Sequence, residues 1–159
     1  MSGAPLAPRG GSSSAWSGPP LAGYRDRAEA ALFDWVGPAL AAYLVQVPLL
    51  ALGRGVAALA QALVLVAALA WMVRNALLQG RTGMTYGKRR VGIRLVDRSS
   101  FAVVGPRRSF LRAAAHALDL LPCFVGFLLP LVDPARQTLA DKVVGTVVLD
   151  GPTPAPILR

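Results

Sequence analysis

The chain has 159 residues, of which 54% are hydrophobic and only 16% are charged. Soluble domains carry about 25% charged residues, so this chain has too little polar surface to cover a water-soluble fold of its size. It is also too apolar to be disordered throughout. The 17 basic and 8 acidic residues give a net charge of +9, which suits anionic lipid as well as nucleic acid. The composition therefore predicts a membrane protein of about one domain.

The composition also limits the chemistry of the chain. One cysteine, Cys123, and one histidine, His116, exclude an internal disulfide and leave too few ligands for a zinc site. The sequence contains no nucleophile elbow, no HExxH motif and no Cys–His pairing. We therefore expect no enzyme activity, no metal and no cofactor. Cys123 is expected to pack as a small apolar residue.

The domain organisation follows from the change of composition along the chain. Residues 1–23 are rich in Gly, Pro, Ala and Ser, which predicts a disordered N-terminal tail. The apolar and basic segments that follow predict one membrane domain over residues 24–150, with a short C-terminal tail over 151–159.

Two long apolar stretches come first, Leu32–Leu52 and Gly55–Val73. A membrane-spanning helix needs roughly 20 apolar residues, and neither stretch alternates as a barrel strand does. We predict two transmembrane helices, over about 27–53 and 55–79. The turn between them, Gly53-Arg54-Gly55, is so short that the helices must form an antiparallel hairpin.

Polar groups within this hairpin are few. Pro38 lacks the amide that would bond the carbonyl group of Asp34, so polarity is expected to concentrate there. Gln46 and Gln61 can satisfy polar groups across the two helices. These features allow a kinked first helix around a small polar cavity, and they fit ordinary packing about as well.

The third apolar stretch, Ala113–Val132, permits two readings. It contains His116 and Asp119, and its uncharged part is interrupted by two prolines and a glycine. We predict a helical segment over about 108–132 that either crosses the bilayer or bends back as a re-entrant hairpin.

Two β-prone runs, over about 91–97 and 145–149, bear on this choice. An isolated strand is not stable, so the simplest arrangement pairs the two runs with each other. Pairing requires the third apolar stretch to enter and leave on the same side of the membrane, which is the arrangement we favour. A true span would keep the strands apart.

The basic residues predict the orientation. Nine basic residues and one acidic residue lie between Arg81 and Arg112, whereas the turn at Arg54 holds one basic residue. The positive-inside rule places the N-terminus and residues 81–112 in the cytoplasm, in a multi-pass protein of the inner (plasma) membrane. The run Lys88-Arg89-Arg90 has no interleaved aromatic residues, so it predicts contact with anionic lipid headgroups or a protein partner, and no nucleic acid.

Asp34 lies inside the first apolar stretch and has two interpretations. An intramembrane carboxylate is costly and marks a functional site, here an ion or proton site gated by Arg27 or Arg74. Alternatively, Asp34 forms a buried pair with Arg74, which lies beside Asn75 at a similar depth on the second helix, and this pair locks the hairpin.

A second polar group, formed by Arg112, His116 and Asp119, shares one face of the third segment. A His–Asp pair beside a membrane can relay protons, whereas a lone histidine at an interface is more often simply solvated. The sequence leaves both readings open.

Three stretches, taken together, resemble the RDD family of membrane proteins. The first is Arg27 before the first helix with Asp34 inside it. The second, Gly83–Asp97, is similar to the family's T-x-G-K-x-x-x-G-(apolar)-x-V-V-D loop. The third, Arg136–Val148, is similar to its closing q-x-L-H-D-x-x-x-G-T-x-V-V segment. The resemblance covers nearly the whole chain after the N-terminal tail.

The family name refers to one arginine and two aspartates. The resemblance maps the arginine and the first aspartate onto Arg27 and Asp34, and the second aspartate onto Asp141, with Asp119 as the weaker candidate. Ala140 stands where the family often has histidine, which puts a proton role of that histidine in doubt. The resemblance implies a membrane protein with a transport-related function, which in some members is linked to sodium/proton exchange.

The sequence therefore predicts an all-α membrane protein with two transmembrane helices in a hairpin, a third span or re-entrant hairpin, and a short cytoplasmic β pairing. The predicted function is transport of a cation, a proton or a small solute. We expect a homo-oligomer or a larger membrane complex, because two or three segments cannot enclose a pathway alone. The alternative is a non-transporting adaptor or scaffold whose basic loop binds a protein partner or anionic lipid.

Overall fold

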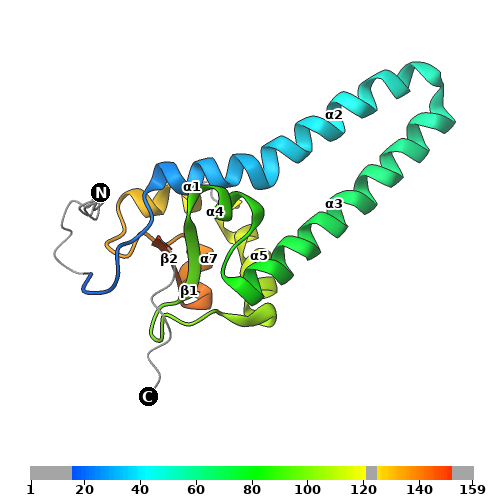
Figure 1. The fold of residues 1–159 in the computed structure, drawn as a ribbon. Coiled ribbons are helices and arrows are strands. Elements are labelled where there is room, and N and C mark those ends of the chain that lie inside the picture. The colour runs from blue at the N-terminus through cyan, green and yellow to red at the C-terminus, as the bar shows by residue number, and fades with distance from the viewer. Residues whose placement is uncertain (1–15, 121–124, 152–159) are drawn as a thin grey trace, which may run out of the picture.

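The computed structural model describes residues 16–120 and 125–151, and the fold has two parts (Figure 1). A long helical hairpin projects from a compact module of short helices and two strands. Most of the described residues are helical, which confirms the mainly helical class, although the helices are more numerous than predicted.

The hairpin has two long arms joined at Gly53. Its first arm runs as one continuous helix from Tyr24 to Leu52, and its second arm is α3, Arg54–Thr82. The first arm consists of α1 (Tyr24–Ala31), the π-helical turn η1 (Leu32–Val36), α2 (Gly37–Leu49) and the 3-10 turn η2 (Leu50–Leu52). Each arm is 29 residues long, and its most apolar 18-residue window contains no buried residue. By length and composition both arms can span a membrane, and most of their large apolar side chains are exposed.

The polar contacts predicted within the hairpin are present. The indole Nε1 of Trp71 donates to the carbonyl oxygen of Asp34 at 2.8 Å, which is the carbonyl group that Pro38 leaves without its helical partner. Gln46 and Gln61 are hydrogen-bonded side chain to side chain. The π-helical turn lies just before Pro38, where such turns absorb a local break in helical bonding.

The compact module follows α3. Its elements are α4 (Tyr86–Val91), β1 (Ile93–Asp97), α5 (Gly105–Leu120), α6 (Val125–Leu128), the 3-10 turn η3 (Leu129–Leu131), α7 (Leu139–Val144) and β2 (Thr146–Asp150). The strands pair antiparallel with Leu95 opposite Val148, so the predicted pairing is confirmed. Ile93, Leu95 and Val148 are almost fully buried and form a core with Ala22 and Ala30 of the N-terminal segment.

The third apolar stretch is not one straight helix over 108–132. Helix α5 ends at Leu120, and α6 packs back against it, with Gly126 so near Asp119 that a Cβ atom there would lie 2.5 Å from the Asp119 Cα atom. The chain therefore reverses, which is the bent alternative and allows β1 and β2 to meet. Cys123 lies in residues 121–124, outside the described residues.

Residues 16–23, at the end of the segment predicted as an N-terminal tail, contact the module. The backbone of Ala22 donates to the carbonyl group of Val148 at 2.9 Å, and Leu21 forms a β-bridge with Leu149. Trp16 packs edge-on against Phe101, with ring centroids 6.2 Å apart. These apolar side chains cover the outer face of the strand pair. The rest of the predicted tails, residues 1–15 and 152–159, lies outside the described residues.

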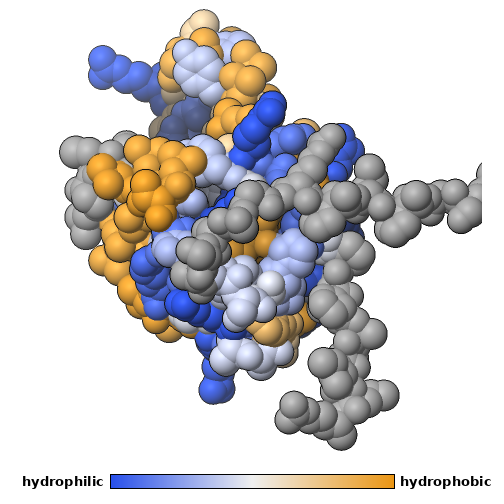
Figure 2. Space-filling view, turned by 90° about the vertical axis from the view of Figure 1, so that its left-hand side faces the viewer, coloured by the Kyte–Doolittle hydropathy of each residue, from blue (hydrophilic) through white to orange (hydrophobic). Residues whose placement is uncertain are grey.

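The surface of the module differs from that of the hairpin. On the side turned away from the hairpin, hydrophilic residues lie beside a hydrophobic patch (Figure 2). The two arms, in contrast, expose leucine and valine side chains along most of their length. The molecule thus combines an apolar rod with a mixed, basic body.

Candidate functional site

Asp34 fastens the first arm of the hairpin to the loop after the second arm. It is only 4% exposed, its Oδ1 accepts from the backbone N–H of Gly87 at 2.8 Å, and its Oδ2 accepts from the hydroxyl of Thr85. Thr85 is also the N-cap of α4, since its Oγ1 accepts from the N–H of Lys88. The approach requires glycine at position 87, because a Cβ atom there would lie 2.1 Å from the carbonyl oxygen of Ala30.

The predicted Asp34–Arg74 pair is wrong. Arg74 is exposed, and its guanidinium group lies over the ring of Trp71, 5.2 Å from the centroid. The π-helical turn and the close approach of α4 direct the Asp34 carboxylate toward Thr85 and Gly87 instead. Asp34 still locks two segments together, but its partners are hydroxyl and amide groups.

Asp141 is the centre of a buried ion-pair cluster. Its Oδ1 accepts from Arg112 Nε and from the hydroxyl of Thr146, both at 2.8 Å. Its Oδ2 lies 3.5 Å from Arg27 Nη1. Burial alone would raise the pKa of Asp141, but the charges of Arg112 and Arg27 outweigh it and hold that pKa well below its usual range. The structure thus joins three of the predicted residues, and the arginine of the first helix pairs with Asp141, not Asp119.

His116 and Asp119 form the pair that their spacing predicts. The His116 Nδ1 atom lies 2.6 Å from Asp119 Oδ2, and the other carboxylate oxygen accepts from the N–H of Leu139 at 2.8 Å. The imidazole stacks on Phe127 at 5.5 Å. Burial, with the positive charge of Arg112, lowers the pKa of His116 to about 4 despite Asp119. A neutral ring donates Nδ1–H to the carboxylate and keeps Nε2 as an acceptor.

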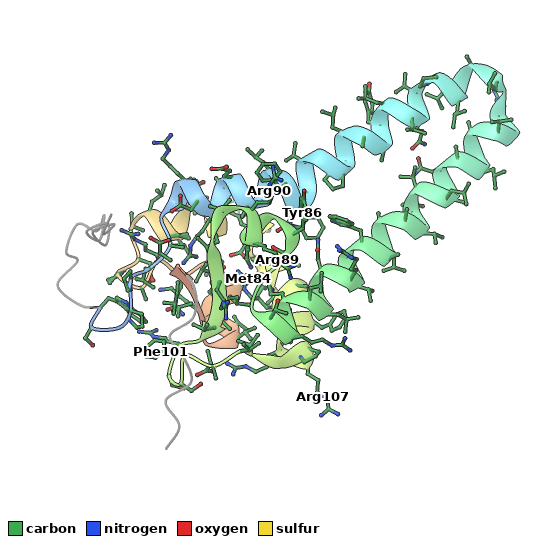
Figure 3. The ribbon with its side chains drawn as sticks, in the orientation of Figure 1. Met84, Tyr86, Arg89, Arg90, Phe101 and Arg107 are labelled. Carbon is green, nitrogen blue, oxygen red and sulfur yellow. The ribbon has the colours of Figure 1, made fainter. Side chains whose placement is uncertain are left out.

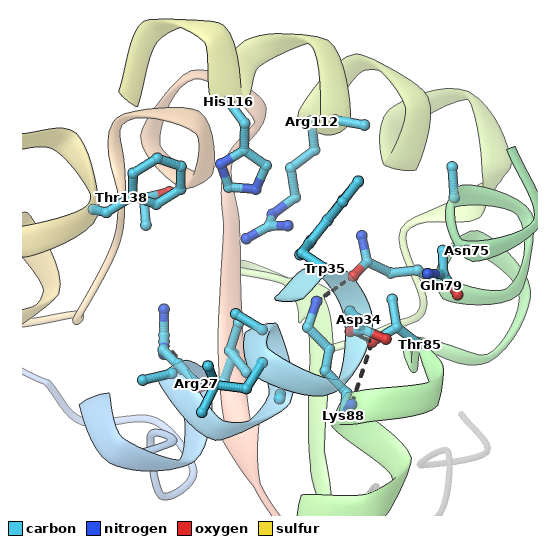
Figure 4. A pocket seen from close by; sticks show the side chains of 18 of the residues that line it. Arg27, Asp34, Trp35, Asn75, Gln79, Thr85, Lys88, Arg112, His116 and Thr138 are labelled. Atoms are coloured by element: carbon cyan, nitrogen blue, oxygen red, sulfur yellow. Dashed lines mark hydrogen bonds between the residues drawn. The ribbon is translucent and has the colours of Figure 1, made fainter. Parts of the chain in front are cut away.

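Lys88 is placed differently from the prediction for the basic run. Its side chain turns inward, and the ammonium group donates to the Oε1 atom of Gln79 (Figure 4). Among the described residues it makes no ion pair. Burial, and then the charge of Arg112, lowers the pKa of Lys88 well below its ordinary value. Arg89 and Arg90 remain exposed, as a headgroup or partner contact requires, and Arg90 lies over the ring of Phe33.

Several of these residues line a cavity of about 1010 Å³ between the base of the hairpin and the module, which we call the interhelical cavity. Its charged lining consists of the cations Arg27, Lys88 and Arg112 and the carboxylate Asp34 (Figure 4). Its remaining lining residues are Tyr24, Ala28, Ala30, Ala31, Leu32, Trp35, Val36, Met72, Asn75, Ala76, Gln79, Thr85, Ala113, Ala114, His116, Ala117, Phe127, Pro130, Thr138 and Val148. Such a size is typical of a small-molecule site.

Two polar groups of this lining are buried without partners. In the part of the chain that the structure describes, neither the Nδ2 nor the Oδ1 atom of Asn75 has a hydrogen-bond partner, and neither does Arg27 Nε. Buried polar atoms are almost always bonded, and each unpaired one costs about 1–3 kcal/mol. Within the described residues no cluster of three or more His, Cys, Asp or Glu side chains is suited to a metal ion. The cavity therefore offers donors and an amide acceptor to a ligand.

A comparison with protein families supports the resemblance that was noted in the sequence. The RDD family model matches residues 21–145, most of the chain. This chain belongs to the RDD family. The match includes the Asp34 contacts, the Arg27–Asp141 pair and all but one of the elements of the fold, since it ends just before β2.

Curated relatives of this RDD protein come from mycobacteria. A protein called proline-rich antigen homolog from Mycobacterium tuberculosis is 42% identical over 90 residues, which are 56% of this chain and 38% of the relative. The proline-rich antigen of Mycobacterium leprae is 38% identical over 87 residues, which are 50% of this chain and 35% of the relative. The chain thus spans little more than a third of the length of these relatives. No solved structure matches it.

Some residues of the site in this RDD protein could not be predicted from the sequence. Gln79 and Thr85 read as ordinary polar residues near a helix end, and Asn75 is noticed only for its depth. The one available signal is Thr85-x-Gly87-Lys88, where a capping residue, a glycine and a cation stand together. That pattern indicates a tight backbone approach but does not reveal which group approaches.

Proposed function

We propose that this RDD protein is a membrane-inserted binding protein whose interhelical cavity takes an anionic ligand. The observation that carries the proposal is the charge of the cavity lining. Three cations face the cavity, whereas Asp34 is the one carboxylate among the lining residues and is already bonded to Thr85 and Gly87.

The three cations are not equally satisfied. Arg27 and Arg112 share the single carboxylate of Asp141. Of the three nitrogen atoms of the Arg112 guanidinium group, only Nε is hydrogen-bonded to a described residue. Within residues 16–120 and 125–151, the Lys88 ammonium group is hydrogen-bonded only to the neutral amide of Gln79. A half-buried cation without a carboxylate partner carries part of the cost of desolvation, so binding of an anion to Lys88 and Arg112 offsets that cost.

The hairpin supports the membrane part of the proposal. The arm from Asp34 to Leu52 rises about 28 Å at about 1.5 Å per residue, close to the roughly 30 Å hydrocarbon thickness of a bilayer. With the hairpin inserted, the cavity lies at the membrane surface. The basic module then faces the cytoplasm and Arg54 faces outside, by the positive-inside rule.

The transport and adaptor functions predicted from the sequence stay predictions. Both carboxylate oxygens of Asp34 are occupied by donors, so its contacts favour a structural role over an ion or proton site. A pathway through the interhelical cavity requires further copies or partners, since one hairpin encloses no pore. Arg89 and Arg90 remain exposed for an adaptor contact with a protein or anionic lipid.

The test is the stability of the detergent-solubilised full chain with inorganic phosphate. At equal ionic strength, phosphate should raise the thermal midpoint above that in chloride, since a ligand at 100 times its Kd adds about 2.7 kcal/mol to stability. Lys88→Gln should abolish the difference. Arg89→Gln, one position along the same helix and exposed, should keep it.

The Lys88→Gln variant should fold, because the backbone N–H that caps α4 is unchanged and the lost side-chain bond reaches a neutral amide. Without phosphate its midpoint should equal or exceed that of the wild type, since the buried cation is gone. Equal midpoints in phosphate and chloride for the wild type, or an equal response of both variants, would contradict the anion site.

A further inference from the structure

The interhelical cavity joins a polar interior to the apolar surface of the hairpin. Leu32, Trp35 and Val36 line it from the first arm, and Met72 lines it from α3. The same three residues of the first arm are more than half exposed and lie at the start of the apolar arm. The rim of the cavity is thus continuous with the surface that a bilayer would cover. A ligand lodged there can extend from the cation cluster onto lipid-facing helices.

The size of the cavity argues against a bare inorganic anion as its full occupant. A volume of about 1010 Å³ is large beside a phosphate ion, which takes up about as much space as three water molecules of about 30 Å³ each. Much of the remaining lining is apolar, from Leu32, Val36, Met72, Phe127 and several alanines. Filling this space favourably requires apolar atoms attached to the anion.

Asn75 narrows the chemistry of the anionic end. It is 4% exposed and lines the cavity, with both its Nδ2 donor and its Oδ1 acceptor unpartnered. For a ligand that reaches Asn75, a phosphate oxygen can accept from the amide Nδ2. The Oδ1 atom needs a donor, which phosphate diesters lack but a hydroxyl-bearing headgroup supplies. One molecule that carries a phosphate and a neighbouring hydroxyl satisfies both atoms.

The geometry points to an acidic phospholipid with a hydroxyl-bearing headgroup, of the phosphatidylglycerol type, as the ligand of the interhelical cavity. Its phosphate lies between Lys88 and Arg112, its headgroup hydroxyl donates to Asn75, and its acyl chains leave over Trp35 and Val36 along the hairpin. This inference rests on the proposed anion-binding function and on insertion of the hairpin. It names the source of the anion as the surrounding membrane.

A lipid and a water-soluble phosphate ester can be distinguished as ligands of the cavity. A water-soluble phosphate ester and a lipid offer the same group to Lys88 and Arg112, but only the lipid covers the exposed rim at Trp35. If the rim contributes, affinity rises with apolar tail length at constant headgroup. Each buried CH₂ contributes about 0.8 kcal/mol, or roughly a fourfold gain.

The experiment uses native mass spectrometry of the full chain in detergent, with phosphatidylglycerol, phosphatidylcholine of the same acyl chains, and glycerol phosphate offered in separate titrations. We expect one phosphatidylglycerol per chain, bound at least tenfold more tightly than phosphatidylcholine or glycerol phosphate. Lys88→Gln and Asn75→Leu should each weaken this binding tenfold or more. Arg89→Gln and Arg107→Gln should not, because both arginines are exposed and Arg107 points away from the body of the molecule (Figure 3).

The variants distinguish the outcomes. Asn75→Leu removes two unpaired polar atoms, so its thermal midpoint without lipid should be no lower than that of the wild type, which checks its folding. Binding of glycerol phosphate as tightly as phosphatidylglycerol overturns the lipid inference and leaves the anion site standing. Loss of binding in the Arg89 or Arg107 variants equal to that in Lys88→Gln overturns it in favour of general surface attraction. Absence of binding by every probe overturns both proposals.

Discussion

Residues of the same charge have different partners and positions in this protein. Asp34 and Asp141 are both buried aspartates, yet Asp34 binds a hydroxyl and an amide whereas Asp141 binds two arginines. Lys88 and Arg89 are adjacent cations, yet only Lys88 faces the cavity. Position in the fold, more than residue type, decides which charges are available to a ligand.

His116 makes a testable difference to stability below neutral pH. Its pKa is lowered from 6.5 to about 4 in the folded chain, so the unfolded chain binds more protons between these values. The contribution of neutral His116 to the free energy of unfolding is therefore fully present above about pH 6.5. It is lost as the pH falls toward 4, and the total loss is about 3 kcal/mol. His116 is the single histidine of the sequence, so the expected slope between about pH 6.5 and 5, above the range of the carboxylates, belongs to it.

The measurement is the free energy of unfolding in detergent at several pH values from about 7 to 4.5. His116→Gln keeps a donor for Asp119 and does not titrate, so its stability should vary little over this range. A wild-type slope that persists in this variant, or a wild type that becomes more stable in acid, would refute a neutral buried imidazole.

Short elements, more than the long helices, build the site. Helix α4 has six residues, too few for stability of its own, and it is held by the Thr85 cap and the Asp34–Gly87 bond. That attachment turns Lys88 toward the cavity. Helix α7 is likewise fixed by its capping box of Thr138 and Asp141, which brings the Asp141 carboxylate to Arg112.

Gly87→Ala should test the attachment of α4. A methyl group at this position meets the carbonyl oxygen of Ala30 at 2.1 Å, so α4 must move away from the first arm and lose the bond to Asp34. We expect the free energy of unfolding to fall by about 2–3 kcal/mol and phosphate stabilisation to weaken.

Gly55→Ala is the matched control, because it lies in α3 with nothing within 4 Å of its added Cβ atom. It should be neutral or stabilising by up to about 1 kcal/mol, as alanine favours helix over glycine. Equal effects of the two substitutions would show that the close approach at Gly87 does not hold the site together.

The molecule as a whole separates an apolar hairpin from a charged body (Figure 1). The two candidate spans are exposed along their apolar windows, whereas the buried ion pairs gather in the module beneath them. This division places the interhelical cavity at the junction of the two parts. It also makes insertion of the hairpin a direct test of the architecture.

Cysteine labelling should reveal the orientation. In a Cys123→Ser background, Arg54→Cys at the hairpin tip should react with a membrane-impermeant maleimide added to intact cells. Arg107→Cys, in the first turn of α5, should react only after the membrane is permeabilised. Labelling of Arg107→Cys alone in intact cells would show that the orientation is opposite to the predicted one. Labelling of both variants in intact cells would contradict a spanning hairpin.

Local pattern was sufficient for the helical hairpin and for the two β-prone runs, because length, apolar runs and turns act between neighbours in the sequence. The bend of the third apolar stretch stayed one of two alternatives until the tertiary structure paired the strands. The family resemblance added Arg27, Asp34 and Asp141. Packing alone decided that Arg27 meets Asp141, 114 positions away, that Asp34 meets the amide of Gly87, and that Lys88 points inward. Such contacts depend on how distant elements approach one another, and the cavity exists only where they do.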